Sequence, residues 1–305
     1  MKLGFLTVPF GDWTLEQVAS WASENGFEAV EVACWPASSG DARRYAGVTH
    51  IDVDTLDYTA AAQIRSTLDG LGIEISGLGY YPNNLHPDPE HRASVNEHTR
   101  KVIRAAARLD VPVVNTFAGR DPQRTHPENI AEFRTVWPGI VEEAESLGVK
   151  VAIENCPMIF SLDEWPGGLN LAYSPAIWRE LFEIVGSSSF GLNLDPSHLV
   201  WQMIDYERAV YDFGDRIFHV HAKDLEVRRD GLYEHGVMSA GIGWQVPRLP
   251  GLGEVRWDRF IAALYAAGYD GSVVIEHEDR RFEGSEELVI RGFRLARDVL
   301  RPYIV

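Results

Sequence analysis

Residues 128–154 read ENIAEFRTVWPGIVEEAESLGVKVAIE, and they contain one full copy of the pattern that decides the fold. Residues 128–147 form a helical stretch, Gly148 is a helix-stop residue, and residues 149–154 form a short apolar run. A run of this length and composition is typical of a strand that is buried on both faces. The stretch therefore predicts a helix that ends at a glycine and leads directly into a buried strand.

The same pattern recurs along the whole chain of 305 residues. Candidate strands lie at 3–8, 28–34, 73–79, 112–117, 149–154, 190–195, 216–221 and 272–276. Helical stretches lie at 14–25, 54–71, 90–110, 128–147, 175–185, 204–213, 256–267 and 285–300. Polar caps begin the first two stretches at Thr14 and Asp54, and glycines end several of them, namely Gly26, Gly72, Gly148 and Gly268.

Eight strand-then-helix units without a long linker predict an α/β protein that forms a single (β/α)8 TIM barrel over residues 1–305. An open doubly wound sheet is the structural alternative. Such a sheet usually carries a glycine-rich phosphate loop after its first strand, whereas residues 8–14 read VPFGDWT. Residues 35–53 and 222–255 are too long for simple turns, so we expect them to form a lid or a pocket wall on the catalytic face.

The composition is that of an acidic globular protein. Apolar residues make up 45% of the chain and the formal net charge is −17, so nucleic acid is not expected as a partner. Cys34 and Cys156 are far apart and in no metal or redox spacing, which fits free thiols in a reducing cytoplasm. The opening MKLGFLTVPF turns polar too soon for a signal peptide, and no apolar run approaches the roughly 20 residues of a membrane span. We therefore expect a cytoplasmic protein without membrane contact.

Four consecutive candidate strands end in a side chain that can bind a metal. These side chains are Glu154, Asp195, His221 and Glu276. The ends of neighbouring barrel strands share one rim, so three carboxylates and one imidazole can converge there. Burying three carboxylates together without a cation would be very costly, which predicts one divalent metal. Oxygen-rich ligands with one imidazole favour Mn²⁺, with Mg²⁺, Co²⁺ and catalytic Zn²⁺ as alternatives.

Further polar residues lie close to these strand ends. His198 lies just after the sixth strand, and we expect it to bind substrate. Lys223 follows His221 by two residues, and it either contacts substrate or pairs with Asp224 or another acid. Alternation places His219 one layer deeper than His221, where a packed interior histidine is the favoured interpretation.

Aromatic residues are expected to frame the pocket at the barrel mouth. Trp35 follows the second strand, and Tyr80 and Tyr81 follow the third. We take Trp35 and Tyr80 as substrate-binding candidates, with simple filling of the rim as the alternative. Arg120 and Arg248 are single candidates for phosphate binding without a clear phosphate motif, so we expect an unphosphorylated substrate.

Four short motifs occur in order, each at its own strand: I-E-N at 153–155, L-D-P-S-H at 194–198, H-A-K-D at 221–224 and I-E-H-E at 275–278. Together they resemble the xylose isomerase-like barrel family. The segment P-G-L-G-E-V-R-W at 250–257 is also similar, and the resemblance extends over nearly the whole chain. The family contains sugar phosphate isomerases and epimerases, ketose 3-epimerases, inosose dehydratases and endonuclease IV.

The resemblance implies that the four strand-end residues bind the metal. In the family's ketose 3-epimerases, the glutamates that match Glu154 and Glu276 also exchange the proton. His198 matches a substrate-contacting histidine of the family. Those epimerases place an arginine six residues after the metal histidine, where this chain has Val227 followed by Arg228.

These observations predict a metal-dependent sugar isomerase or epimerase. The metal would stabilise an enediolate while Glu154 and Glu276 move the proton beside the carbonyl group. The alternative is a lyase or dehydratase that acts on a keto-sugar, a keto-inositol or a 3-keto-glycoside. Such an enzyme shares the first proton abstraction and then expels a leaving group.

Two other classes fit the sequence less well. An enzyme of the endonuclease IV type needs three metals and extra histidines at the ends of the third and fourth strands, where this chain reads GLGYY and NTFAG. A non-catalytic sugar-binding barrel would not need two glutamates beside a metal. We expect a small-molecule carbohydrate as the partner. Homo-oligomers are common among such barrels, and the sequence does not fix the number of subunits.

Overall fold

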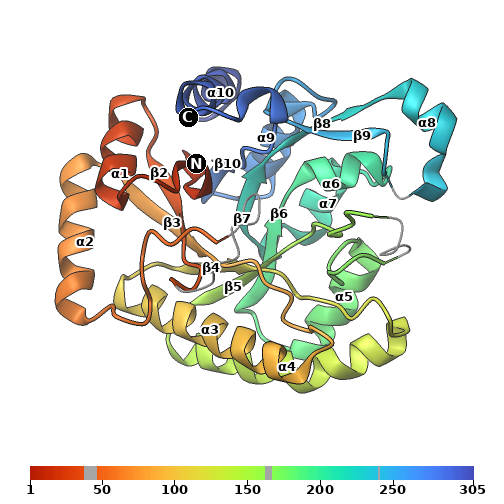
Figure 1. Ribbon diagram of the computed structural model, residues 1–305, viewed down its shortest axis with the longest axis horizontal. Coiled ribbons are helices and arrows are strands. Elements are labelled where there is room, and N and C mark those ends of the chain that lie inside the picture. Colours follow the sequence, from red (N-terminus) through yellow and green to blue (C-terminus); the bar gives the residue numbers. More distant parts are fainter. Residues whose placement is uncertain (38–46, 162–166, 240) are drawn as a thin grey trace.

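The computed structural model describes residues 1–37, 47–161, 167–239 and 241–305. Eight parallel strands close into a barrel in the order β1-β10-β7-β6-β5-β4-β3-β2 (Figure 1). The strands are β1 (Lys2–Leu6), β2 (Ala29–Ala33), β3 (Glu74–Gly79), β4 (Val113–Thr116), β5 (Lys150–Glu154), β6 (Phe190–Leu194), β7 (Ile217–Ala222) and β10 (Ser272–Ile275). Each overlaps its predicted segment, and the predicted (β/α)8 barrel is confirmed.

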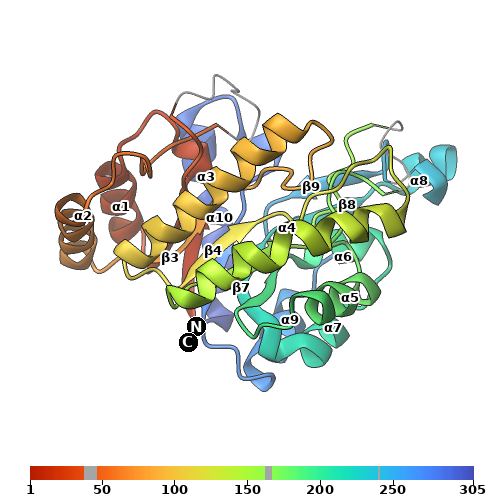
Figure 2. The ribbon, with the colours of Figure 1, turned by 90° about the horizontal axis from the view of Figure 1, so that it is seen from below.

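Helices cover the outside of the barrel (Figure 2). They are α1 (Leu15–Glu24), α2 (Tyr58–Leu71), α3 (Pro89–Arg108), α4 (His126–Ser146), α5 (Pro175–Val185), α7 (Tyr206–Phe213), α9 (Trp257–Ala266) and α10 (Glu286–Leu300). In α5 the buried residues Ile177, Trp178 and Leu181 follow the spacing of a helix that turns one face inward. A short additional helix, α6 (Pro196–Trp201), comes directly after β6.

Helix starts follow the capping chemistry of the sequence. Thr14 caps α1 as predicted: its side chain accepts a hydrogen bond from the Gln17 N–H, and the Gln17 side chain accepts one from the Thr14 N–H. The predicted start of α2 at Asp54 is wrong, because Asp57 is the residue whose side chain caps that helix. The Asp54 carboxylate instead forms an ion pair with Lys101.

Helix ends also follow the prediction. The four predicted stop residues, Gly26, Gly72, Gly148 and Gly268, have φ angles between 70° and 78°. This left-handed conformation is unfavourable for residues with a side chain, so a glycine ends each helix and turns the chain toward the next strand.

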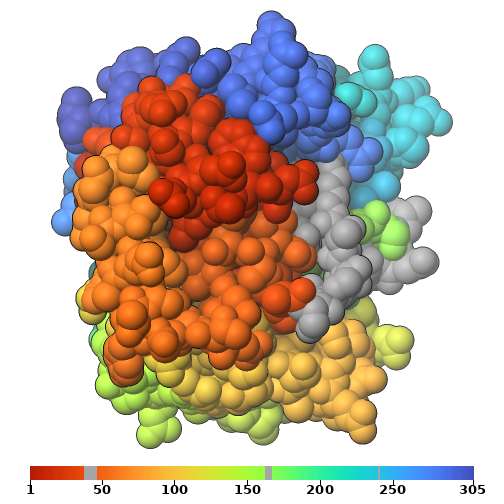
Figure 3. All heavy atoms as spheres, turned by 60° about the vertical axis from the view of Figure 1, so that its left-hand side comes forward, coloured from red at the N-terminus to blue at the C-terminus, as the bar shows by residue number. Residues whose placement is uncertain are grey.

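The first and last elements meet in an aromatic cluster that closes the barrel. The Phe5 ring of β1 has its centroid 4.7 Å from that of Phe293 in α10 and 4.9 Å from that of Phe27. Phe10 and Trp21 belong to the same cluster. On the surface, red N-terminal residues adjoin blue C-terminal residues (Figure 3), and the two termini lie side by side (Figure 2).

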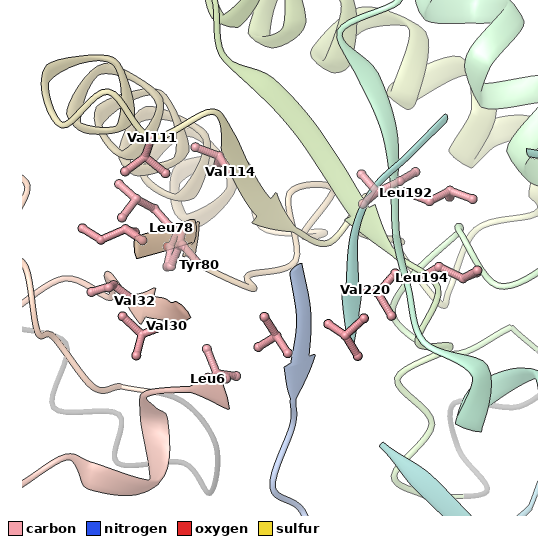
Figure 4. Close-up of a cluster of buried hydrophobic side chains, with 14 of the residues drawn as sticks. Leu6, Val30, Val32, Leu78, Tyr80, Val111, Val114, Leu192, Leu194 and Val220 are labelled. Atoms are coloured by element: carbon pink, nitrogen blue, oxygen red, sulfur yellow. The ribbon is translucent and has the colours of Figure 1, made fainter. Parts of the chain in front are cut away.

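Alternation along the strands separates an apolar face from a polar barrel interior. Val30 of β2 belongs to the hydrophobic cluster drawn in Figure 4, whereas the neighbouring Glu31 faces β7 across the barrel. On β7, Val220 belongs to the same cluster, and His219 and His221 lie in the interior. The predicted position of His219 as a packed interior histidine agrees with its 1% exposure.

Residues 222–255 contain a hairpin that follows β7 directly. Strand β8 (Asp224–Val227) pairs antiparallel with β9 (Gln245–Arg248), and α8 (Arg229–His235) projects from the body of the protein (Figure 1). The buried Arg248 fixes the hairpin, since its Nε donates to Glu226 Oε2 at 2.7 Å and its Nη1 donates to Asp279 Oδ1 at 3.0 Å.

The other long segment, residues 35–53, lies partly outside the described residues, which omit 38–46. Within its described part, Thr49 forms an isolated antiparallel bridge with Cys34 at the end of β2. Within the described ranges, no helix combines the length and apolar character that crossing a membrane requires.

Candidate metal centre

The carboxyl ends of β5, β6, β7 and β10 bring the four predicted metal ligands to one side of the barrel mouth. Glu154 is the last residue of β5, Asp195 follows β6, His221 lies in β7, and Glu276 follows β10. These four strands are consecutive neighbours in the barrel. All four residues are buried, and the most exposed of them, Glu276, is 9% exposed.

His221 lies between two of the carboxylates. Its Nδ1 is 3.3 Å from Glu276 Oε2 and 3.7 Å from Glu154 Oε1. The donor atoms of these three residues lie within 4.8 Å of one another, which is close enough to share one cation. Asp195 joins the group through His198, whose Nε2 is 3.2 Å from Asp195 Oδ2 and 3.5 Å from Glu154 Oε1.

Several polar atoms of this group are buried and accept or donate no well-directed hydrogen bond among the described residues, although some lie within ion-pair distance of a neighbour. They are Glu154 Oε1, Asp195 Oδ2, His198 Nε2 and His221 Nδ1. Buried polar atoms without a partner are costly and rare in native proteins. A divalent cation would satisfy the oxygens of Glu154 and Asp195 and the Nδ1 atom of His221 together. This set of donor atoms suits Mn²⁺, Mg²⁺, Co²⁺ or Zn²⁺. The side chains present therefore fit a metal ion.

Asparagine side chains hold the backbone of Glu154 and of Asp195 in place. Asn155 Oδ1 accepts from the Asp195 N–H at 2.7 Å, and its Nδ2 donates to the Asp195 carbonyl oxygen at 2.9 Å. Asn170 Nδ2 donates to the Glu154 carbonyl oxygen at 2.9 Å. Asp195 Oδ1 accepts from the Ser197 N–H and so caps α6, which leaves Oδ2 for another partner.

Lys223 places a buried ammonium group among carboxylates. Its Nζ is 2.6 Å from Glu276 Oε2, 3.1 Å from Asp195 Oδ2 and 3.2 Å from Glu278 Oε2. The Asp224 carboxylate instead accepts from backbone N–H groups and an indole N–H. The ion pair that the sequence left open is therefore made with these three acids and not with Asp224.

Burial and charge shift the pKa values of the site in opposite directions. Burial lowers the pKa of Lys223, but the surrounding carboxylates, Glu276 first, raise it well above its ordinary value. Burial raises the pKa of Glu154, but contacts with two histidines, His198 first, bring it below its ordinary value. Burial raises the pKa of Glu278, and the charge of Lys223 offsets only part of that rise. The site thus combines the fixed cation of Lys223, the ionised carboxylate of Glu154 and the carboxyl of Glu278, which keeps its proton more readily.

The remaining predicted substrate residues lie in different surroundings. His198 is on α6 and faces the carboxylates, with 12% of its side chain exposed. Trp35 is 8% exposed, and its ring centroid lies 6.1 Å from that of Tyr81. Tyr80 belongs to the hydrophobic core (Figure 4), and its ring meets His98 of α3 edge-on at 4.6 Å. Trp35 belongs to the same core cluster as Tyr80, and a substrate contact stays a prediction for both.

Sequence reasoning missed Glu31, which lies beside the site, and it named Tyr81 only together with Tyr80 as a residue that frames the pocket. The Tyr81 hydroxyl donates to Glu31, and its ring centroid lies 5.8 Å from that of His221. Alternation beyond β3 could have separated Tyr81 from Tyr80, because consecutive residues face opposite sides of a strand. For Glu31 the available signal was an acid in the middle of an otherwise apolar, buried strand.

Two arginines considered from the sequence have structural contacts in the hairpin. Arg248 is held by Glu226 and Asp279, so its guanidinium is already paired. Arg228 follows Val227 of β8, has a side chain that is 53% exposed, and lies 3.5 Å from Glu226. Neither takes the place of the arginine that the family's ketose 3-epimerases carry after the metal histidine.

A family model described as xylose isomerase-like TIM barrel matches residues 19–299. The chain belongs to this family. The uncharacterised protein YfiH of Bacillus subtilis (strain 168) is 27% identical to this chain, and the match covers 92% of this chain and 93% of YfiH.

Solved structures with the same fold match this chain over nearly its whole length. D-psicose 3-epimerase with D-tagatose, from Clostridium cellulolyticum H10, matches with a TM-score of 0.71 at 17% identity, covering 100% of this chain and 99% of that chain. AsbF, a probable 3-DHS dehydratase from Bacillus anthracis, matches at 0.70 and 17% identity, covering 97% and 98%. IolI with a bound zinc atom matches at 0.69 and 18% identity, covering 99% of each. At these identities the likeness establishes the fold alone.

Proposed function

We propose that this protein is a divalent-metal-dependent sugar isomerase or epimerase that moves a proton on a carbon next to a carbonyl group. The observation that carries the proposal is the convergence of Glu154, His221 and Glu276, whose donor atoms lie within 4.8 Å of one another. Asp195 is the proposed fourth ligand. These residues lie at the carboxyl ends of the barrel strands, where TIM-barrel enzymes carry their active sites.

The proposed cofactor is one divalent metal, with Mn²⁺ favoured and Mg²⁺, Co²⁺ or Zn²⁺ as alternatives. When bound, it supplies charge stabilisation for the enediolate oxygens that derive from the carbonyl group and the adjacent hydroxyl of the substrate. The zinc atom bound to IolI supports a metal on this fold.

Glu154 and Glu276 are the proposed catalytic residues. They flank His221 from β5 and from the end of β10, and neighbouring cationic groups outweigh burial to lower the pKa of each carboxyl. Both are therefore ionised near neutral pH, and one can take the proton from the substrate carbon. In an epimerase the other returns a proton to the opposite face of that carbon, and in an isomerase a proton returns to the neighbouring carbon. A positioned base or acid typically contributes about 10²- to 10⁴-fold in rate.

His198 and Lys223 are the proposed polar contacts of the substrate, because their N–H groups face the same carboxylates that would hold the metal. Trp35 and Tyr80 stay the proposed aromatic contacts, and we add Tyr81, whose ring lies beside those of Trp35 and His221. D-psicose 3-epimerase with D-tagatose, a sugar epimerase on the same fold, supports a small carbohydrate as the substrate. We further propose that this sugar is unphosphorylated.

A lyase or dehydratase on a keto-sugar, a keto-inositol or a 3-keto-glycoside is the second candidate. The observation that favours it is the ion-pair chain from Glu276 through Lys223 to Glu278. Burial raises the pKa of Glu278, so a carboxyl able to protonate a leaving hydroxyl shares the Lys223 ammonium with the proposed base, Glu276. The dehydratase AsbF, which has the same fold, supports this candidate.

We propose that nucleic acid is not a substrate. We also propose a cytoplasmic location for the enzyme. The extra histidines that an enzyme of the endonuclease IV type would need are absent from the ends of β3 and β4. The histidines farther along the chain have other contacts: His86 and His91 have ring centroids 4.4 Å apart, and His126 lies 3.0 Å from Glu180. The net charge of −17 also opposes a phosphate backbone. A homo-oligomer remains compatible with the proposal.

The test is deuterium exchange in D₂O, followed by NMR, with keto-sugars, inososes and 3-keto-glucosides, in the presence and absence of Mn²⁺. We expect metal-dependent exchange at a carbon beside a carbonyl group, and the product separates isomerisation, epimerisation and elimination. Glu154→Gln and Glu276→Gln should each abolish the exchange. Failure of the protein to bind a stoichiometric divalent metal would contradict the proposal.

Glu74→Gln is the matched control for these variants. Glu74 is the first residue of β3, at the opposite end of a barrel strand, and its exposed side chain pairs with Lys2. The same chemical change there should leave both exchange and metal binding unaltered. Equal losses in all three variants would point to general unfolding and not to a role in proton transfer.

A further inference from the structure

Glu31 is a fully buried carboxylate that none of the four strand-end motifs contains. It lies in β2, on the opposite side of the barrel from the proposed ligands, and its Oε2 is 2.7 Å from His221 Nε2. A Cβ at Gly79, in the neighbouring strand β3, would come within 2.6 Å of Glu31 Oε1. The absence of a side chain at Gly79 therefore leaves the space that the Glu31 carboxylate fills.

The contacts of Glu31 determine which nitrogen of His221 carries a proton. The Tyr81 hydroxyl donates to Glu31 Oε1, and Asn193 Nδ2 donates to the Tyr81 oxygen at 3.1 Å. An ionised carboxylate only accepts hydrogen bonds, so His221 Nε2 must donate to Oε2. The Tyr81 oxygen also lies 3.2 Å from His221 Nε2, but its single proton goes to the nearer carboxylate.

The other nitrogen of His221 is then free for a metal. With Nε2 engaged by Glu31, His221 Nδ1 faces Glu276 Oε2 at 3.3 Å and Glu154 Oε1 at 3.7 Å, where a bound metal would take the place of the Nδ1 proton. This nitrogen is buried and has no hydrogen-bond partner among the described residues. One imidazole thus connects a carboxylate on β2 with the proposed metal site at the ends of β5 and β10.

Glu31, His219 and His221 also lie close enough to suggest a separate metal site. The contacts of His219 argue against it, because its Nδ1 is 3.0 Å from Asn193 Oδ1 and its Nε2 is 3.1 Å from Ser76 Oγ. Both ring nitrogens already have neutral hydrogen-bond partners. The cluster is therefore a hydrogen-bonded support for His221 and not a second cation site.

We propose that Glu31 is a positioning residue that holds His221 as the Nε2–H tautomer with Nδ1 directed at the metal; this rests on the metal centre of the proposed function. Metal-bound histidines commonly donate their second N–H to a carboxylate, and loss of such a partner typically costs about 10- to 100-fold in metal affinity or activity. Glu31 is not among the strand-end residues, because it lies within β2 and acts through His221 without binding the metal itself.

The experiment measures Zn²⁺ binding by isothermal titration calorimetry in the full-length protein and its variants. Glu31→Ala removes the acceptor, and we expect its Zn²⁺ affinity to fall by about 10- to 100-fold. Glu31→Gln keeps an acceptor oxygen for His221 and an N–H for the Tyr81 oxygen but loses the charge, so a smaller loss is expected. Ser76→Ala is the matched control, because Ser76 is buried in the same interior and contacts only the other histidine, His219.

A second measurement does not depend on any variant folding correctly. In Zn²⁺-loaded wild-type protein labelled with ¹⁵N-histidine, long-range ¹H–¹⁵N spectra should show His221 with a protonated Nε2 and a metal-bound Nδ1. A metal-bound Nε2, or unchanged affinity in Glu31→Ala, overturns the proposal while leaving the metal centre intact. A wild-type protein that binds no Zn²⁺ or Mn²⁺ overturns this proposal and the proposed function together.

Discussion

Lys223 Nζ lies 2.6 Å from Glu276 Oε2, so a fixed cation shares the carboxylate that is proposed to bind the metal. The same ammonium lies 3.1 Å from Asp195 Oδ2, on a second proposed ligand. At 2% exposure, Lys223 cannot exchange these partners for water. In the metal-free protein it is therefore a main counter-charge for the carboxylates of the barrel mouth, and metal binding adds a second one.

Replacing Lys223 should destabilise the metal-free protein most. In Lys223→Met the acids lose a buried partner, and breaking such a pair typically costs about 3–5 kcal/mol in the free energy of unfolding. Saturating Mn²⁺ should restore much of that loss, because it supplies the missing positive charge. Thermal unfolding with EDTA and with Mn²⁺ should thus show a larger metal-induced rise in Tm for the variant than for the wild type.

Lys2→Met is the control for that measurement. Lys2 pairs with Glu74, but its side chain is 47% exposed, and exposed pairs contribute about 0–1 kcal/mol. Its Tm should change little under either condition. Equal destabilisation of Lys223→Met with and without metal would show that the lysine is only a packing element.

Metal binding should release about one proton near pH 7. Burial lowers the pKa of His221, but the charges of Glu31 and Glu276 raise it well above its ordinary value, so the metal-free imidazole is protonated on both nitrogens. The metal needs the neutral ring, hence it displaces the Nδ1 proton, and affinity rises as pH rises toward that pKa. Glu154 and Glu276 release no proton on metal binding, because the pKa of each carboxyl lies below its ordinary value and both are already ionised.

Calorimetry in two buffers of different ionisation enthalpy checks this proton release. The observed binding enthalpy should differ between the buffers by about one ionisation enthalpy per metal ion bound. Identical enthalpies in both buffers would mean that His221 is already neutral, or that it does not bind the metal.

Arg248 should matter for stability and not for phosphate binding. It is 2% exposed and pairs with Glu226 and with the fully buried Asp279. Arg248→Ala leaves the Asp279 carboxylate without its cation, so the free energy of unfolding should fall by about 3–5 kcal/mol in urea denaturation. Arg228→Ala, which removes a half-exposed partner of Glu226, should cost no more than about 1 kcal/mol. Similar losses in the two variants would contradict a specific role for the Arg248 pairs.

Much of the fold could be predicted because the deciding signals are local. Short apolar runs that follow a glycine stop mark the strands, and the position of Gly148 before β5 is one example. The start of α2 could not be fixed in this way, because Asp54 and Asp57 are both good caps and only the folded chain selects Asp57. The hairpin of β8 and β9 was also not foreseen, since its pairing joins residues about 20 positions apart.

The candidate metal ligands could be predicted from the sequence for the same reason. Each is the last residue, or close to it, of a recognisable strand, and the barrel topology alone brings strand ends together. The role of Glu31 could not be predicted, because it depends on a contact across the barrel with His221, which lies 190 positions away in the sequence. The sequence could not decide between Tyr80 and Tyr81, because the choice depends on where β3 ends, and strand boundaries are the least certain part of any sequence reading.

The aromatic cluster at the closure of the barrel offers a prediction about stability. Phe293 of α10 is fully buried, and its ring centroid lies 4.7 Å from that of Phe5 and 5.4 Å from that of Phe10. Phe293→Ala should lower the free energy of unfolding by about 3–5 kcal/mol, because the cavity lies between the first strand and the last helix and cannot collapse without opening the barrel. Tyr303→Ala, at an aromatic residue that is 41% exposed, should change it by about 0.5 kcal/mol or less. Urea denaturation of both variants checks this, and a loss for Phe293→Ala as small as that for Tyr303→Ala would mean that the contacts between β1 and α10 do not hold the barrel closed.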